Sequence, residues 1–258
     1  MANPFAGKRI IITGASSGIG AELARQLASQ GARLALAARR EPELQTVAAA
    51  CRERGGEALV VPTDVTSEEQ CRRLSEQAVA AWGGLDLLIN NAGISMRKLF
   101  AELDDLSVLA NIMAVNYLGS VYCTHYALPH LLQSRGRIVV ISSLAGKVGA
   151  PTRSGYSASK HALHGFFDAL RVELAGSGVS VTLVCPGFVD TGIRRYGEDG
   201  ALRPRGMAVE VCAGKIVRAA ARRRRELVMT PIGKVGRFIK PFLPGLIDRV
   251  ARRKVGLP

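Results

Sequence analysis

The chain has 258 residues, 48% of them hydrophobic, and a formal net charge of +14 at pH 7. This length and composition suit a single α/β domain with a substantial core. No run of 18 or more apolar residues is present, which argues against a membrane-spanning helix, and a strand-like run from Lys8 leaves no room ahead of it for a secretory hydrophobic segment. Five scattered cysteines without a C-x-x-C pair argue against a disulfide framework or a zinc site, so we expect a cytoplasmic protein.

The positive charge is concentrated near the C-terminus. Residues 222–258 hold eleven Lys and Arg residues against two acidic ones. Nucleic-acid binding is not the preferred explanation, because this region also contains apolar clusters and the breaks that Pro241 and Pro244 impose. A mixture of basic and apolar residues is typical of a segment at an anionic membrane surface. We therefore expect residues 231–258 to form a basic, apolar tail that lies at a membrane surface or packs on the protein.

Short runs rich in Val, Ile and Leu alternate with longer segments whose apolar residues recur at helical spacing. We expect seven strands, at residues 9–13, 33–37, 58–61, 85–89, 137–142, 180–184 and 227–229. The helices are expected at residues 19–30, 42–54, 67–82, 103–133, 156–175 and 208–221. This alternation predicts a doubly wound α/β fold, with a parallel sheet of about seven strands flanked by helices in one domain over residues 1–230. Ligands are expected at the carboxyl ends of the strands.

A glycine-rich segment, from Thr13 to Gly20, joins the first strand to the first helix. Small residues at this point let backbone N–H groups approach a pyrophosphate at the helix N-terminus. The glycine spacing is G-x-x-x-G-x-G rather than the common G-x-G-x-x-G, so an ordinary tight turn remains an alternative. The candidate contacts are Gly14, Ser16, Ser17, Gly18, Ile19 and Gly20.

The second strand ends in Ala37-Ala38-Arg39-Arg40, without an acidic residue. A carboxylate here would accept a hydrogen bond from a ribose 2′-hydroxyl and repel a 2′-phosphate, whereas guanidinium groups suit a phosphate. We therefore expect NADP(H) as the cofactor, with Arg39 and Arg40 as phosphate contacts. The alternative for each arginine is a solvated charge at the start of a helix.

Tyr156 and Lys160 are four residues apart, so they share one face of a predicted helix. A cation beside a phenol favours the phenolate and lowers its pKa, which would let Tyr156 act as a general acid or base. Ser143 directly follows the fifth predicted strand, where its hydroxyl would hydrogen-bond a substrate oxygen, and Ser142 is the alternative. The Tyr-Lys spacing by itself is common by chance.

Four motifs in this order, TGASSGIG, NNAG, YSASK and PG, resemble the short-chain dehydrogenase/reductase family over about residues 6–230. The resemblance implies a Rossmann-type fold, a nicotinamide cofactor and a subunit that forms a homodimer or homotetramer. It favours Ser143 over Ser142. It also implies that Asn116 holds a water beside Lys160, the alternatives being a local helix bend or an exposed polar position. The further cofactor contacts that it implies are Asp64, Val65, Asn91, Ala92, Gly93, Tyr156, Lys160, Pro186, Gly187, Val189 and Thr191. Asp64 is equally compatible with a helix cap.

The residues around Ser143 and Tyr156 are most similar to the 11β-hydroxysteroid dehydrogenase-like branch, whose members often act on steroids and lipid-like ketones. We therefore expect an NADP(H)-dependent enzyme that interconverts a carbonyl and an alcohol on a lipophilic small molecule. The alternative is a non-catalytic NADP-binding sensor or interaction protein. Residues 188–207 should cover the substrate, and their arginines either bind an acidic group or are solvated; these are Arg194, Arg195, Arg203 and Arg205. Neither a metal nor nucleic acid is expected.

Overall fold

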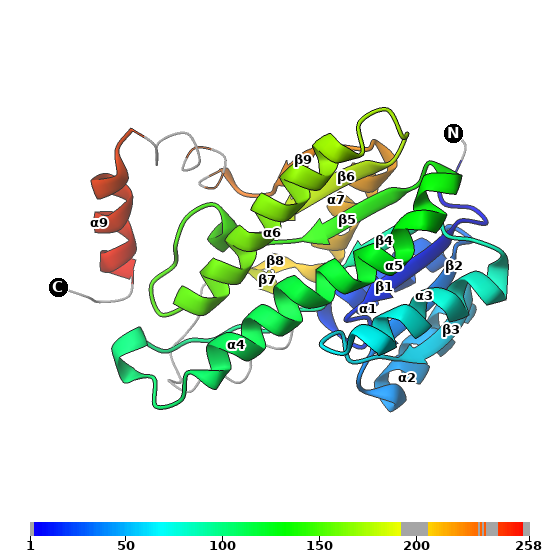
Figure 1. Ribbon diagram of the computed structural model, residues 1–258, viewed down its shortest axis with the longest axis horizontal. Helices are drawn as coiled ribbons and strands as arrows, with labels where there is room; N and C mark the ends of the chain where they lie inside the picture. The colour runs from blue at the N-terminus through cyan, green and yellow to red at the C-terminus, as the bar shows by residue number, and fades with distance from the viewer. Residues whose placement is uncertain (1–2, 192–205, 232, 234, 236–241, 255–258) are drawn as a thin grey trace.

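The computed structural model describes residues 3–191, 206–231, 233, 235 and 242–254. Its centre is a seven-stranded parallel sheet with the strand order β3-β2-β1-β4-β5-β6-β9 (Figure 1). The strands are β1 (Arg9–Thr13), β2 (Arg33–Ala38), β3 (Glu57–Pro62), β4 (Leu87–Asn90), β5 (Arg137–Ile141), β6 (Ser180–Cys185) and β9 (Glu226–Val228). All seven predicted strands are confirmed, each to within two residues at either end.

Helices cover both faces of this sheet (Figure 1). One face carries α1 (Gly18–Ala28), α2 (Glu41–Arg52) and α7 (Val209–Ala221), and the other carries α3 (Glu68–Trp82), α5 (Gly119–Ser134) and α6 (Ser154–Glu173). Successive strand residues point to opposite faces, so Ile10 and Ile12 of β1 pack in the first core cluster and Ile11 packs in the second. The predicted doubly wound α/β architecture is confirmed.

The single helix expected over residues 103–133 is wrong in its start and its continuity. The chain instead forms the 3-10 turn η1 (Phe100–Glu102), α4 (Ser107–Met113), the π-helical turn η2 (Ala114–Leu118) and then α5. The helix starts late because Asp105 accepts a hydrogen bond from the backbone N–H of Ser107 at 2.7 Å, which ends the preceding loop at that point. The π turn carries Asn116, and π turns often occur at functional sites.

Several smaller elements complete the described structure. A 3-10 turn, η3 (Leu144–Gly146), follows β5, and a short parallel ribbon joins β7 (Val189–Asp190) to β8 (Met207–Ala208). The helix α9 (Pro244–Lys254) begins at a proline and lies at one end of the molecule, away from the sheet (Figure 1). Among the described helices, none is long and apolar enough to cross a membrane.

The strand order has a switch point between β1 and β4. These two strands are neighbours, but the chain leads from β1 to β2 on one side and from β4 to β5 on the other. In sheets of this kind the crevice at the carboxyl ends of the strands, beside the switch point, binds the ligand. The glycine-rich turn after β1 and the segment after β4 meet at this crevice.

Candidate active site

The turn between β1 and α1 is built from positions that need glycine. Gly14 and Gly18 have positive φ angles of 64° and 55°, a backbone conformation that favours glycine. A Cβ atom on Gly14 would lie 2.9 Å from the Cα atom of Ala92, and a Cβ atom on Gly20 would lie 2.3 Å from the carbonyl oxygen of Gly14. The backbone of the turn therefore approaches both itself and the segment after β4 more closely than any side chain would allow.

Hydrogen bonds hold the turn against the segment after β4. The Asn91 side-chain amide donates to the carbonyl oxygens of Thr13 at 2.9 Å and Gly14 at 3.2 Å. In return, the Thr13 hydroxyl accepts from the backbone N–H groups of Asn91 and Ala92, both at 3.0 Å. The Asn91 side chain is thus occupied in shaping the turn, and Thr13 is a positioning residue that the sequence reading did not single out. Its place at the last position of β1, beside the strand β4 that ends at Asn90 and is followed by Asn91, was the available signal.

The start of α1 can accept an anion. Ser17 is the N-cap residue, but its side chain makes no capping hydrogen bond, so the first N–H groups of the helix are left for another acceptor. The Arg40 guanidinium lies 3.3 Å from the hydroxyl oxygens of both Ser16 and Ser17, and it also pairs with Glu43 at 2.9 Å. Arg39 is exposed and has no ion-pair partner within the described part of the chain. A turn with glycine at its close approaches, an uncapped helix start and two arginines fit the phosphates of a dinucleotide.

Asp64 and Val65 lie just beyond β3. The Asp64 carboxylate accepts from the N–H and hydroxyl of Thr66 at 3.0 and 2.8 Å, whereas Ser67 caps α3 by accepting from the N–H of Gln70. Asp64 therefore shapes a local turn. The sequence had also allowed it to be the N-cap of the next helix, but Ser67 has that role. Val65 is buried in the core, so any contact it makes with a cofactor must come mainly from its backbone.

Tyr156, Lys160 and Ser143 lie together at the carboxyl edge of the sheet. Tyr156 and Lys160 are on α6, and Ser143 follows β5, where its hydroxyl accepts from the N–H of Ala145 and lies near enough to the Tyr156 phenol to lower its pKa. The Lys160 ammonium donates to the carbonyl oxygen of Ile141 at 2.8 Å and lies 5.7 Å from the centre of the Tyr156 ring. The three side chains predicted to carry the chemistry are therefore brought together by two elements that meet at one strand end.

The electrostatics of this group differ from the sequence-based expectation. Burial raises the pKa of Tyr156, and this effect outweighs the hydrogen bond from Ser143 and the charge of Arg153, which lower it. Burial also lowers the pKa of Lys160 to about 8. Because the ammonium is directed to the Ile141 carbonyl, it does not produce the lowered phenol pKa that the Tyr-Lys spacing suggested.

Asn116 lies in the π turn η2 and is completely buried. Its side-chain oxygen accepts from the N–H of Ile94 at 2.8 Å, and its amide donates to the carbonyl of Ile94 at 3.0 Å and to the hydroxyl of Ser159 at 2.9 Å. A Cβ atom on Gly93 would lie 3.2 Å from this side-chain oxygen and 3.5 Å from the Lys160 nitrogen. Asn116 thus joins the segment after β4 to α6, and the helix is distorted at this residue. The water that Asn116 was expected to hold beside Lys160 stays a prediction.

The segment after β6 runs beside Ser143 and the turn that follows it. The backbone N–H of Leu144 donates to the carbonyl of Pro186 at 3.1 Å, and a Cβ atom on Gly187 would lie 2.6 Å from the Thr230 methyl group. Val189 is buried in the β7–β8 ribbon, and Thr191 follows it, half-buried. The four arginines of the predicted substrate loop, Arg194, Arg195, Arg203 and Arg205, lie outside the described residues.

A buried polar network lies behind Lys160. The Ser142 hydroxyl lies 3.1 Å from Nε2 of His164 and 3.5 Å from the carbonyl oxygen of Lys160, and the Cys185 sulfur lies 3.7 Å from the same His164 nitrogen. Ser142 therefore faces inward, away from Tyr156, which supports Ser143 as the substrate-side serine. The sequence reading did not place His164 in this network. It follows Lys160 by four residues, the same helical spacing as Tyr156 and Lys160, and this spacing was the available signal.

Comparisons with known proteins agree with this geometry. The family model described as short chain dehydrogenase matches residues 8–200. An 11-beta-hydroxysteroid dehydrogenase A from Arachis hypogaea is 44% identical over 260 residues, covering 94% of this chain and 74% of that protein. A dehydrogenase/reductase SDR family protein 7-like from Dictyostelium discoideum is 38% identical, covering 95% of this chain and 80% of that protein.

A solved structure gives the same result for the fold. A short chain dehydrogenase/reductase from Burkholderia phymatum, in complex with NAD, superposes with a TM-score of 0.84 at 30% identity, covering 94% of this chain and 96% of that one. The residues that the family model matches include the glycine turn and the group formed by Ser143, Tyr156 and Lys160. The chain belongs to the short-chain dehydrogenase family of oxidoreductases, in the branch that resembles the 11-beta-hydroxysteroid dehydrogenases.

Proposed function

We propose that this chain is an NADP(H)-dependent oxidoreductase that interconverts a ketone or aldehyde and an alcohol. The observation that carries the proposal is that Ser143 and Tyr156 lie together, with Lys160 behind them, at the same sheet edge as the phosphate-binding turn. A nicotinamide cofactor held at that edge supplies or accepts the hydride. The protein's own task is then to position the substrate oxygen and to move one proton.

The proton step falls to Tyr156. Because burial raises its pKa, the phenol is protonated at neutral pH, and it donates this proton to the substrate oxygen as a carbonyl is reduced. Ser143 hydrogen-bonds the same oxygen and stabilises its developing negative charge. In the oxidative direction Tyr156 takes the proton back from the alcohol. Lys160, whose ammonium donates to the Ile141 carbonyl, lies 5.7 Å from the centre of the Tyr156 ring as this proton moves.

The test is NADPH oxidation by Tyr156→Phe, with Tyr126→Phe as the matched control. The Tyr126 hydroxyl bonds Glu68 at the surface, so its removal should leave turnover unchanged. Loss of the general acid should lower kcat by roughly 100- to 10,000-fold with little change in NADPH affinity. Equal turnover by the Tyr156→Phe variant and the parent protein would contradict the role of Tyr156. NADPH binding without turnover of any substrate would instead favour a non-catalytic sensor.

The choice of NADP(H) rests on Arg39 and Arg40, since the strand end that carries them has no acidic residue. The Burkholderia phymatum relative was solved with NAD, so the preference needs a direct test. For Arg39→Ala and Arg40→Ala we expect kcat/KM for NADPH to fall about tenfold or more, while kcat/KM for NADH stays within about twofold. An equal loss with both cofactors would contradict the assignment of Arg39 and Arg40 as contacts of the 2′-phosphate.

A lipophilic ketone or alcohol is the proposed substrate. The relatives named as 11-beta-hydroxysteroid dehydrogenases support it, as does Phe188, which is exposed directly after Gly187 with the Arg153 guanidinium 5.7 Å from its ring centre. A panel of ketosteroids, medium- and long-chain ketones, quinones and 3-oxoacyl thioesters would identify the class. Turnover confined to small hydrophilic carbonyls would contradict the proposal.

Two further parts of the proposal concern contact with a membrane and the number of subunits. Phe242 and Leu243 are exposed just before α9, whose described side chains include Arg249, Arg252 and Arg253, and this supports peripheral contact with anionic lipid. Cosedimentation with phosphatidylserine vesicles should fall when residues 230–258 are removed, provided that the shortened chain retains its thermal unfolding transition.

A homodimer or homotetramer is proposed from the family membership, and light scattering after gel filtration tests it.

A further inference from the structure

Four consecutive arginines, Arg222 to Arg225, connect α7 to β9 at the edge of the sheet opposite the candidate active site. Arg223 has a positive φ of 49°, so the chain turns sharply there. Its guanidinium donates to the carbonyl oxygens of Gly178 and Arg135, both at 2.7 Å. Arg225 lies 3.6 Å from a carboxylate oxygen of Asp168. Two of the four arginines are thus used by the protein's own structure.

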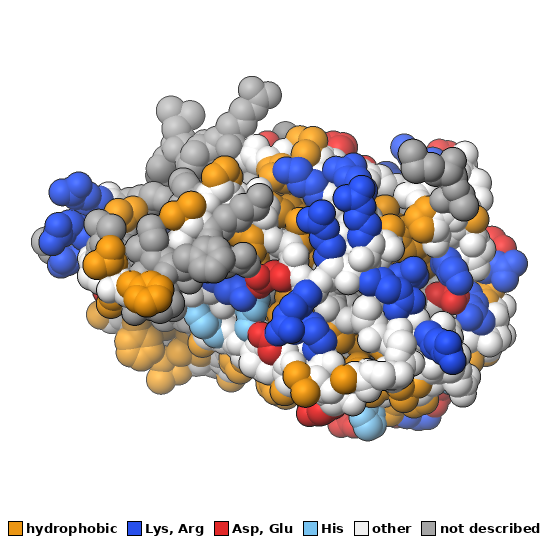
Figure 2. All heavy atoms as spheres, turned by 90° about the horizontal axis from the view of Figure 1, so that it is seen from above, with side chains coloured by type: hydrophobic (Ala, Val, Ile, Leu, Met, Phe, Trp, Pro, Cys, Tyr) orange, Lys and Arg blue, Asp and Glu red, His pale blue; other side chains and the backbone are white. Residues whose placement is uncertain are grey.

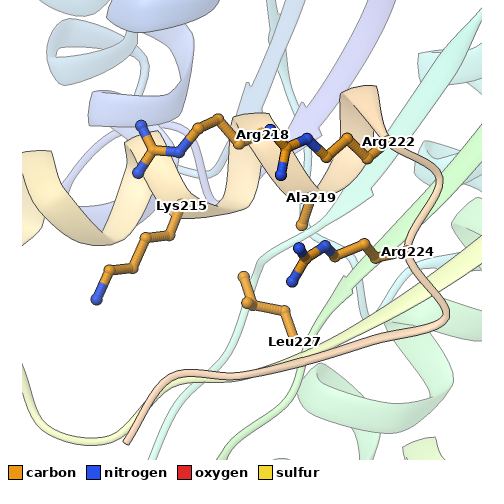
Figure 3. Close-up of a pocket in the computed structure, with 6 residues that line it drawn as sticks. All are labelled: Lys215, Arg218, Ala219, Arg222, Arg224 and Leu227. Atoms are coloured by element: carbon orange, nitrogen blue, oxygen red, sulfur yellow. The ribbon is translucent and has the colours of Figure 1, made fainter.

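The other two, Arg222 and Arg224, line a pocket of about 110 Å³. Lys215, Arg218 and Ala219 of α7 and Leu227 of β9 complete its lining. Figure 3 shows Arg222 and Arg224 extending in the same direction on either side of Ala219, with Lys215 and Arg218 further along α7. The spacing of Lys215, Arg218 and Arg222 places them along one helix face, so the pocket has four cations over a small apolar floor.

No carboxylate of the described chain forms an ion pair with these four cations. Glu226, which adjoins Leu227 in β9, pairs with Lys147 at 2.6 Å, and Glu22 of α1, which packs against α7, pairs with Arg25 at 3.4 Å. Lys and Arg side chains also form clusters on the face of the molecule seen from above (Figure 2). Uncompensated like charges repel one another, so this arrangement lowers stability unless an anion binds.

The helix dipole accounts for only part of the cluster. Arg218 and Arg222 lie in and just after the last turn of α7, where cations are favourable. Lys215 lies further back, and Arg224 lies beyond the helix on the strand side of the turn. These two residues bring charge into the same pocket from places that the dipole does not favour. A bound anion explains all four positions.

The chemistry of the lining favours a phosphate group. Three guanidinium groups offer planar pairs of N–H donors that match phosphate oxygens, and an ammonium adds a mobile donor. The pocket is small, which suits one or two phosphate groups rather than a groove that follows a polynucleotide. Its place at the amino edge of the sheet separates it from the glycine turn, because Arg223 contacts residues at the start of β5.

We propose that Lys215, Arg218, Arg222 and Arg224 form a second binding site, for a phosphate group that carries two or more negative charges. The site does not depend on the proposed oxidoreductase activity. Its ligand is either a free phosphorylated small molecule or the phosphorylated headgroup of an anionic lipid, since both present the same group to the arginines.

The experiment is calorimetric titration of the full-length chain with inorganic pyrophosphate, with and without saturating NADP+. NADP+ occupies the phosphate-binding turn at the opposite edge, so binding that persists in its presence reports on the proposed site. The test variant is Arg222→Gln with Arg224→Gln. The matched control is Arg54→Gln with Arg73→Gln, which removes the same charge from two other exposed arginines.

Saturable pyrophosphate binding that weakens by about tenfold or more in the test variant, and by less than about twofold in the control, would support the site. Bound pyrophosphate should also raise the thermal unfolding temperature of the parent and control proteins but not of the test variant. Equal affinity in all three proteins, or equal weakening in both variants, would overturn the proposal. Vesicles that contain phosphatidylinositol phosphate distinguish the two sources of the ligand. Retention of the protein on these vesicles that requires Arg222 and Arg224 identifies a lipid headgroup. If the protein binds pyrophosphate but is not retained on the vesicles, the ligand is a free small molecule.

Discussion

At the residue scale, the candidate site shows how burial decides the protonation of individual groups. Lys160 is only 4% exposed, and its ammonium donates a hydrogen bond to the main-chain carbonyl of Ile141. Directly behind it, His164 is 8% exposed, and its Nδ1 atom has no hydrogen-bond partner among the described residues. Burial lowers the pKa of both groups, and the charge of Lys147 adds to this effect at His164, so the pKa is about 8 for Lys160 and about 4 for His164. Both side chains are therefore held where their charged forms are disfavoured.

The lowered pKa of His164 predicts a loss of stability in acid. In the unfolded chain the imidazole binds a proton near pH 6.5, and in the folded protein near pH 4, so the folded state binds fewer protons between these values. This contribution is complete above pH 6.5 and is lost as the pH falls to 4, by up to about 3 kcal/mol. Urea unfolding of His164→Gln should show a smaller fall over this window than the parent protein. Parallel curves for the two proteins would contradict the buried, neutral imidazole.

At the element scale, a glycine is required in the β1–α1 turn, whereas a glycine inside the helix α6 is not. Gly20 lies where the turn, the start of α1 and Asn91 meet, and an added Cβ atom would lie 2.6 Å from the Asn91 amide nitrogen. Gly165 lies inside α6, and an added Cβ atom would meet nothing within 4 Å. The first glycine is needed for close packing, whereas the second only lowers the helix propensity.

These two glycines predict opposite results for the same substitution. Gly20→Ala should force the turn away from Asn91, lower the melting temperature and weaken NADPH binding by about tenfold or more. Gly165→Ala should stabilise the protein by about 0.5 to 1 kcal/mol and leave NADPH binding unchanged. Differential scanning fluorimetry and NADPH fluorescence titration measure both quantities. If Gly20→Ala bound NADPH as the parent does, the close approach of the turn would have no part in binding.

At the scale of the whole molecule, the two edges of the sheet have different tasks. The carboxyl edge gathers the candidate active site, and the amino edge is held by Asp86, which precedes β4. The Asp86 carboxylate accepts from the backbone N–H of Arg9 at 3.0 Å and from its guanidinium at 2.7 Å, while the Asp86 carbonyl accepts from the N–H of Arg137. Burial raises the pKa of Asp86, but the hydrogen bonds and charge of Arg9 and the charge of Lys8 lower it by more. One carboxyl residue thus connects β1, β4 and β5.

The position of Asp86 predicts that its charge contributes more to stability than the charge of an exposed carboxylate in a surface ion pair. Asp86→Asn should lower the free energy of unfolding by about 2 kcal/mol at pH 7, because Arg9 loses a partly buried carboxylate. The control is Asp104→Asn, which removes an exposed carboxylate 2.6 Å from Lys98 and should change stability by less than about 0.5 kcal/mol. Urea denaturation at pH 7 compares the two. Equal effects would mean that the network at the amino edge adds nothing beyond a surface ion pair.

The sequence alone determined the elements and the outline of the candidate site. Alternation of apolar runs located all seven strands, because strands buried on both faces must be apolar throughout. The motifs around Gly14, Asn91, Ser143 and Tyr156 indicated one sheet edge, because the carboxyl ends of parallel strands coincide. Side-chain spacing also identified Tyr156 and Lys160 as neighbours on one helix face.

Only the tertiary structure decided how those residues are used. It directed the Lys160 ammonium to a main-chain carbonyl and raised the pKa of Tyr156, because burial depends on elements that are distant in the sequence. It also interrupted the long helix with a π turn, so that buried Asn116 bonds Ile94 and Ser159. It separated the run of four arginines into two that support the fold and two that line a pocket, a division that depends on where a sharp turn directs each side chain. Local pattern determines which elements form, but contacts between distant elements determine the charge and the direction of each group.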